Sequence, residues 1–149
     1  MIAPSALPAL TALAGTLVAA TIDGRTGLIP DMLTRTTALA ALGCTIVNGV
    51  VPLACGGAYA CGGALLALHL LTRGRGIGLG DVKLGTVIGI GFGPVAGLVA
   101  LGAAFVLGGA YASWLLVTRR ARRGDALRFG PFLAAGTLLA ALVPAAVLA

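Results

Sequence analysis

Charged residues are scarce in this chain of 149 residues. It has no glutamate, four aspartates, one lysine and nine arginines, and charged residues make up 9% of it against 59% hydrophobic ones. Its mean hydropathy is +1.08. Because soluble domains carry about 25% charged residues, this composition excludes a soluble domain with one core. It predicts a polytopic membrane protein instead.

Aromatic residues are also few, at 5% of the chain, although the net charge is +6. Proteins that bind single-stranded nucleic acid combine basic residues with aromatic platforms on which bases stack. No such interleaving is present here. Basic residues at the ends of membrane spans stay on the cytoplasmic side of the membrane and attract anionic lipid headgroups. We therefore expect membrane lipid, and no nucleic acid, as a partner.

The three cysteines lack the spacing of a zinc site. Cys44, Cys55 and Cys61 form no CxxC pair, so we predict no metal and no cofactor. Free cysteines behave as small apolar residues. A disulfide between Cys44 and Cys55 stays open as an alternative.

The charges that are present divide the chain into uncharged runs. With His69 neutral, these runs are 1–22, 36–72, 84–118 and 129–149. A helix needs about 20 residues to cross the hydrocarbon core, so each outer run holds one span. The two middle runs are long enough for two spans each. Turn signals divide them, at Asn48-Gly49 to Pro52 and at Gly93-Pro94.

We therefore predict an all-α fold, a single transmembrane domain over residues 1–149 with six membrane-spanning helices. Arginine and lysine gather between the predicted hairpins, which assigns that side to the cytoplasm and both termini to the extracytoplasmic side. The first span has no basic segment before it, so it is expected to be retained and not cleaved as a signal peptide. The predicted spans are 3–22, 34–50, 52–72, 82–96, 98–118 and 130–148.

Small residues recur every fourth position in two of these spans and lead to an aspartate in each. Such ridges let membrane helices approach closely. We expect the two ridges to pack against each other in antiparallel fashion, which would bring both aspartates to the cytoplasmic end. The ridges are Thr11, Gly15 and Ala19 in register with Asp23, and Gly85, Gly89, Gly93 and Gly97 in register with Asp81.

Asp23 and Asp81 are the candidate catalytic residues. Ionisable groups at membrane depth are costly and usually functional. Two crowded carboxylates share a proton, so one acts as base toward water while the other protonates a carbonyl oxygen, as in aspartic proteolysis. Gly78 and Gly80 would let a peptide backbone come close. The sequence leaves open which aspartate is acid and which is base.

These motifs resemble the prepilin peptidases, also called type IV leader peptidases, a branch of the GxGD intramembrane aspartic proteases. In that family the first catalytic aspartate precedes an Ile-Pro pair, matched here by Asp23 and Ile29-Pro30. The second lies in G-x-G-D-x-K-L, matched by Gly78 to Leu84 with Asp81 and Lys83. A third feature, F-G-P-F-L, is present at Phe129 to Leu133, including Gly130 and Pro131.

The resemblance implies an endopeptidase in the cytoplasmic membrane of a prokaryote, with its active site facing the cytoplasm. The substrate would be a prepilin or pseudopilin whose short basic leader is removed. Two departures limit the transfer. Asp31 stands where many members have asparagine, and with no CxxC pair in the sequence we expect no zinc-binding cytoplasmic domain like that of bifunctional members. The chain is therefore similar to the short, peptidase-only form, with methyl transfer, the pilin's identity and the oligomeric state left open.

Other interpretations remain at this point. A small ion- or proton-coupled transport protein would also use intramembrane aspartates, and an inactive relative would only bind pilins. Asp81 or Asp31 could simply cap a helix. His69 is interpreted as an interfacial polar residue, and the run Arg119 to Arg123 as a positive-inside anchor.

Overall fold

A computed structural model describes residues 6–74, 76–120 and 127–143, and it confirms the all-helical prediction for them. The elements are α1 (Ala6–Thr26), α2 (Asp31–Val47), α3 (Val51–Gly57), the π-helical turn η1 (Ala58–Gly62), α4 (Gly63–Leu71), α5 (Leu79–Val117) and α6 (Gly130–Leu142). The outer parts of the predicted first and last spans, residues 3–5 and 144–148, lie outside the described residues.

Among these elements, three stretches are long and apolar enough to cross a membrane: Ala6–Thr26, Val51–Leu71 and Leu79–Val117. The first has 21 residues, which corresponds to about 32 Å of helix. Val51–Leu71 is a continuous rod made of α3, η1 and α4. The helix Gly130–Leu142 is apolar but shorter.

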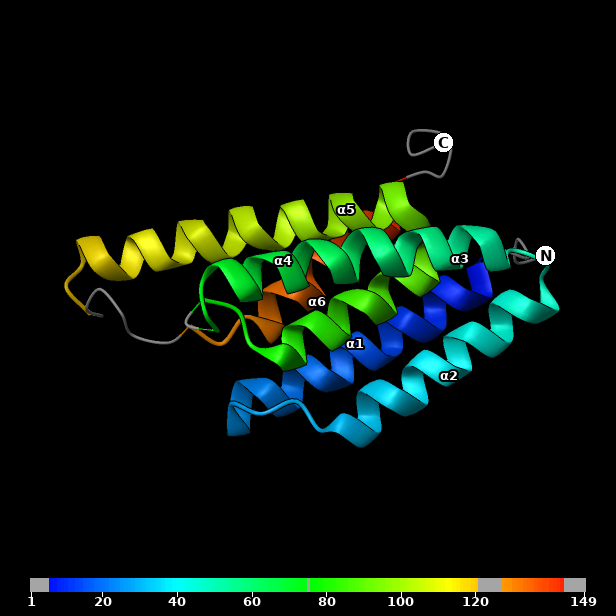
Figure 1. Cartoon of the computed structure of the whole chain (residues 1–149). Coiled ribbons are helices and arrows are strands. Elements are labelled where there is room, and N and C mark those ends of the chain that lie inside the picture. The colour runs from blue at the N-terminus through cyan, green and yellow to red at the C-terminus, as the bar shows by residue number, and fades with distance from the viewer. Residues whose placement is uncertain (1–5, 75, 121–126, 144–149) are drawn as a thin grey trace.

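The two predicted turns lie where the sequence signals them. Gly49 has a φ of 69° between α2 and α3, a left-handed conformation that glycine adopts without steric cost. Gly93 has a φ of 76° and a ψ of −178° and interrupts α5 just before Pro94. A Cβ added at Gly97 would lie 3.4 Å from the Gly89 Cα atom. The two halves of α5 therefore fold back on each other, and Figure 1 shows the chain reversing at this point.

The predicted packing of the two ridges on each other is wrong. A Cβ added at Gly89 would collide with the Gly57 carbonyl, and one added at Gly85 would collide with Leu65. The ridge thus faces the α3–η1–α4 rod, since a GxxxG ridge permits close approach without specifying a partner. Gly93 faces Leu53 of the same rod, and Gly15 faces Thr37 of α2.

Helix α1 contacts the face of α5 that lies opposite the glycine ridge. A Cβ at Gly91 would collide with Ala12 and approach the Pro8 carbonyl oxygen to 2.7 Å. The first half of α5 is therefore held between α1 and the α3–η1–α4 rod. Ala19 is fully buried and belongs to the central cluster, together with Leu84 and Ile88.

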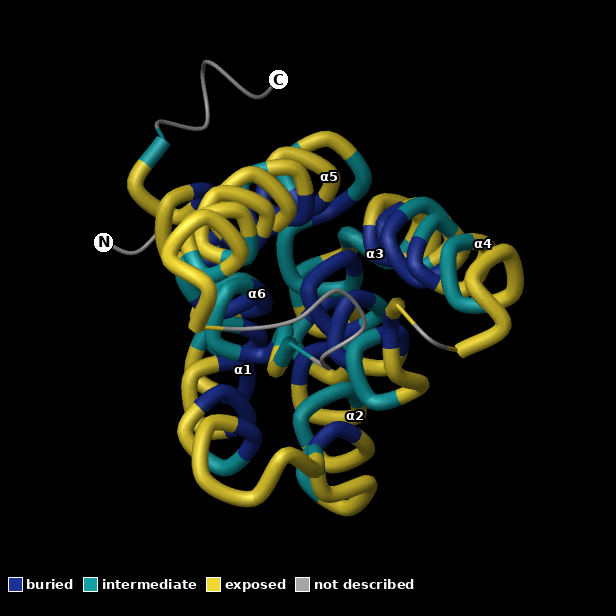
Figure 2. The backbone as a smooth tube through the Cα atoms, turned by 90° about the vertical axis from the view of Figure 1, so that its left-hand side faces the viewer, coloured by how far each residue is buried: buried dark blue, intermediate teal, exposed yellow. Residues whose placement is uncertain are grey.

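Large apolar side chains also cover the outside of the bundle. Tyr59, Leu71 and Val106 are 82%, 80% and 72% exposed. In Figure 2 the buried segments face the centre while the outer helix faces are exposed. This is the distribution expected where lipid, and not water, surrounds the helices.

Candidate active site

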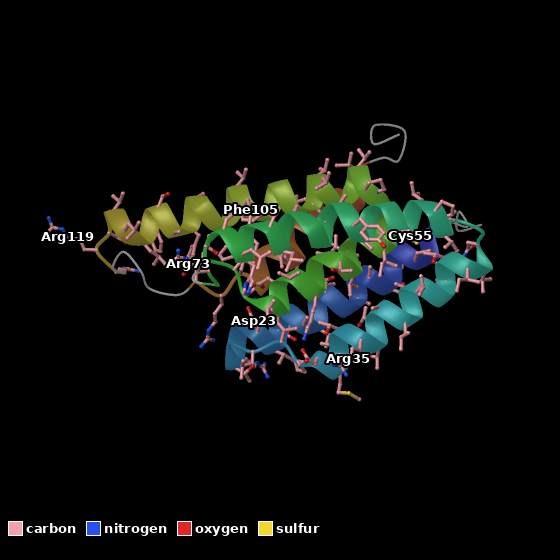
Figure 3. All side chains as sticks on the ribbon, in the orientation of Figure 1. Asp23, Arg35, Cys55, Arg73, Phe105 and Arg119 are labelled. Carbon is pink, nitrogen blue, oxygen red and sulfur yellow. The ribbon has the colours of Figure 1, made fainter. Side chains whose placement is uncertain are left out.

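The charged side chains gather toward one end of the bundle. In Figure 3, Asp23, Arg73 and Arg119 lie toward the same end, whereas Cys55 lies toward the other. Helices α1 and α4 end there, and α2, α5 and α6 begin there (Figure 1). Both predicted catalytic aspartates are carried by these helix ends.

Asp23 lies in the last turn of α1 and is 6% exposed. Its Oδ2 atom accepts a hydrogen bond of 3.1 Å from the backbone N–H of Gly130, the first residue of α6. The first N–H groups of a helix have no partner within the helix, and the helix dipole favours an anion at that position. The start of α6 therefore holds the Asp23 carboxylate.

Gly130 is the residue that permits this approach. A Cβ at position 130 would lie 2.7 Å from Asp23 Oδ2. The neighbouring Arg128 donates a hydrogen bond from its guanidinium group to the Gly24 carbonyl oxygen. The F-G-P-F-L motif thus makes contact with the first aspartate from a distant part of the chain, with Pro131 close to Gly24.

Aromatic packing fixes the start of α6 against the second half of α5. The rings of Phe129 and Phe105 have centroids 4.9 Å apart, and those of Phe132 and Tyr111 have centroids 5.5 Å apart. A Cβ at Gly108 would lie 3.0 Å from Phe129. The Gly130 N–H is therefore placed by side chains on both sides of it.

Asp81 is half-buried in the first turn of α5. Its Oδ2 atom accepts a hydrogen bond of 3.1 Å from the Gly78 backbone N–H, so the carboxylate also closes the start of its own helix. The capping interpretation and the catalytic one are therefore compatible, because the other carboxylate oxygen makes no hydrogen bond within the described residues.

The structure brings the two aspartate motifs together. Asp23, at the end of α1, and Asp81, at the start of α5, lie at the same end of the bundle (Figure 1). A Cβ at Gly80 would lie 3.3 Å from the Ile29 Cβ, so the Ile-Pro loop packs on the GxGD turn. Pro30 has an extended backbone and precedes the first residue of α2.

Asp31 does not cap α2 with its side chain. Pro30 occupies the cap position and no side-chain hydrogen bond is made there. The Asp31 carboxylate instead forms an ion pair with Lys83, with 2.5 Å between Oδ1 and Nζ. The hydrogen bond from Lys83, together with its ammonium charge, holds the pKa of Asp31 below its ordinary value.

His69 has a structural contact that sequence reasoning missed. Its Nδ1 atom lies 2.7 Å from the carbonyl oxygen of Ile77, the residue before the GxGD motif. A Cβ at Gly74, whose φ is 73°, would lie 3.2 Å from the His69 ring. The only sequence signal was a lone histidine ahead of the motif. Arg128 likewise carries no sequence signal for its contact with the Gly24 carbonyl oxygen.

The three cysteines are free, so the disulfide considered between Cys44 and Cys55 is not formed. Among the residues that the structure describes, no three histidine, cysteine or acidic residues gather as metal ligands would. Most of the arginine run, from Ala121 onward, lies outside the described residues.

Together these features define a class: a helical membrane protein with a pair of carboxylates at one end of the bundle. A family model described as the type IV leader peptidase family matches residues 10–113. The chain belongs to this family, which implies that it is a protease. Both aspartate motifs lie within the match, whereas F-G-P-F-L lies beyond it. No curated protein and no solved structure matches the chain.

Proposed function

We propose that the chain is an aspartic endopeptidase that removes the short basic leader of type IV prepilin-like preproteins at the cytoplasmic side of the inner membrane. The observation that supports the proposal is that Asp23 and Asp81, each held by a backbone N–H, lie at the same end of the bundle and inside the family match. Prepilin or pseudopilin substrates fit such an enzyme because family membership points to leader peptides.

Hydrolysis would begin with a water molecule placed between the two carboxylates. The ionised carboxylate takes a proton from the water, while the protonated one donates to the scissile carbonyl oxygen. Either carboxylate can take either role, so neither residue is assigned one. Gly78 and Gly80 leave room beside Asp81 for the substrate backbone. This mechanism requires no metal.

The proposed topology has six spans with both termini outside. It is supported by the reversal at Gly93, which divides α5 into two halves, and by the gathering of Asp23, Arg73 and Arg119 toward one end (Figure 3). The positive-inside rule assigns that end to the cytoplasm. The transport alternative is not favoured, since the family match is to peptidases.

The test is leader removal from a coexpressed prepilin, seen as a mobility shift on a gel. Asp23→Asn and Asp81→Asn should each lower cleavage by about a hundredfold or more, because each removes one acid–base partner. Both variants should stay inserted at normal abundance. Asp125→Asn is the matched control, since it removes the carboxylate that lies outside both motifs. Normal processing by either Asp23→Asn or Asp81→Asn would contradict the mechanism.

A further inference from the structure

The ion pair between Asp31 and Lys83 joins two segments that are distant in the sequence. Asp31 is the first residue of α2 and Lys83 lies in the second turn of α5, 52 residues later. Asp31 directly follows the Ile-Pro loop, and Lys83 follows Asp81 by two residues. The pair therefore connects the loop of the first aspartate to the helix of the second.

Helices α2 and α5 contact each other, and a groove opens on the surface beside this pair. An open groove of about 230 Å³ runs between them, lined by Thr34, Arg35, Ala38, Lys83, Thr86 and Val87. Residues two apart on a helix point in nearly opposite directions, so Lys83 faces α2 while Asp81 faces away from it. At this end of the groove, the ion pair joins the two helices.

We propose that Asp31 and Lys83 form a positioning clamp that sets the distance between the two catalytic segments. This inference rests on the proposed function. Neither residue touches the reacting atoms. The clamp holds the Ile-Pro loop against the GxGD turn, where Ile29 packs on Gly80. It also holds the first turns of α5, which carry Asp81. Asp31, which stands where many family members have asparagine, would thus serve to position the catalytic segments through its ion pair with Lys83.

Because the ion pair is exposed, its effect on the geometry of the active site can be measured apart from its effect on the stability of the fold. The side chains of Lys83 and Asp31 are 44% and 53% exposed. Exposed ion pairs add little to stability and weaken with salt, so losing the pair should leave abundance and thermal stability nearly unchanged. A catalytic dyad is far more sensitive, since a misplacement of about 1 Å can cost on the order of a hundredfold in rate.

Charge reversal tests the clamp in the purified full chain. We expect Asp31→Lys and Lys83→Asp each to lower kcat for leader removal by about tenfold or more, with KM nearly unchanged. The double reversal restores the attraction, so its kcat should recover to within about threefold of the original. The kcat of Asp31→Asn should lie between those of the original chain and of the single reversals. Because salt weakens exposed ion pairs, kcat of the original chain should fall with added salt, whereas that of Asp31→Asn should not. Met32→Lys, at an exposed neighbouring position, controls for added positive charge.

A second measurement does not depend on activity. Cysteines replace Leu28 and Leu79, which are 75% and 54% exposed in the two segments that the clamp joins, in a background without the native cysteines. Crosslinking by a short bifunctional thiol reagent should fall in each single reversal and recover in the double one. Unchanged crosslinking in Asp31→Lys, or a double reversal as slow as the slower single one, would overturn the clamp. Absence of cleavage by the unaltered chain would instead count against the proposed function.

Discussion

At the scale of single residues, Gly130 combines a hydrogen-bond donor with the absence of a side chain. We predict that Gly130→Ala lowers leader removal by about tenfold or more, because its methyl group would enter the space of Asp23 Oδ2, 2.7 Å away, and displace the carboxylate. Cleavage of a coexpressed prepilin measures the loss.

Gly102→Ala is the control for this substitution. It makes the same chemical change in α5 at a position where nothing lies within 4 Å of the added Cβ. Activity should then be unchanged. If Gly130→Ala cleaves as fast as Gly102→Ala, the start of α6 does not position Asp23.

His69 provides a second prediction at this scale. His69→Phe keeps a ring but removes the hydrogen bond to the Ile77 carbonyl oxygen, 2.7 Å from Nδ1. We expect cleavage to fall several-fold and trypsin to cut faster after Arg73, which lies in the loop that this bond closes. His69→Asn retains a donor near Nδ1 and should preserve both properties. Equal behaviour of the two variants would mean that the hydrogen bond is unimportant.

At the scale of elements, the glycine ridge of α5 packs on the α3–η1–α4 rod. We predict that cysteines at positions 65 and 85 form a disulfide in a background lacking Cys44, Cys55 and Cys61, because the Leu65 side chain reaches the place of a Cβ at Gly85. Oxidation followed by non-reducing electrophoresis detects the crosslink.

Cysteines at 15 and 37 serve as a positive control for α1 and α2, since a Cβ at Gly15 would lie 2.8 Å from the Thr37 Cβ. Cysteines at 19 and 85 test the ridge-to-ridge arrangement expected from spacing alone. Efficient crosslinking of 19 to 85, without crosslinking of 65 to 85, would reverse the packing described here.

The positions of the turns could be predicted from sequence, but the packing partners could not. Gly93 precedes Pro94, and this pair signals a break because a left-handed glycine and a proline both end a helix. The spacing of Gly85 and Gly89 indicates a smooth helix face and nothing about what covers it. Nothing in the sequence distinguishes Gly57, the residue that packs against Gly89, from the other glycines.

The candidate site shows the same division. Asp23 and Asp81 could be found because carboxylates are rare in this chain and each stands in a recognisable motif. The donors that hold them are backbone N–H groups, which every residue other than proline possesses. The sequence therefore does not predict that the Gly130 N–H contacts Asp23. The ion pair of Asp31 with Lys83 was hidden by their separation in the sequence.

At the scale of the whole molecule, the proposed topology predicts which residues water-soluble thiol reagents reach from each side. In a background without native cysteines, cysteines at Val47 and Val95, which are 86% and 54% exposed, should be labelled in intact cells. A cysteine at Val117, 83% exposed, should react only after the membrane is opened. Labelling of position 117 in intact cells would invert the assignment.

The hydrogen bond between Gly130 and Asp23 also sets the order in which this protein can become active. Chains are synthesised from the N-terminus, and earlier segments fold first. Both aspartates leave the ribosome long before Gly130, so the growing chain already contains its acid–base pair but lacks the group that orients one of them. A ribosome stalled before Gly130 would therefore display an inert precursor, and insertion of α6 would be the event that switches on proteolysis.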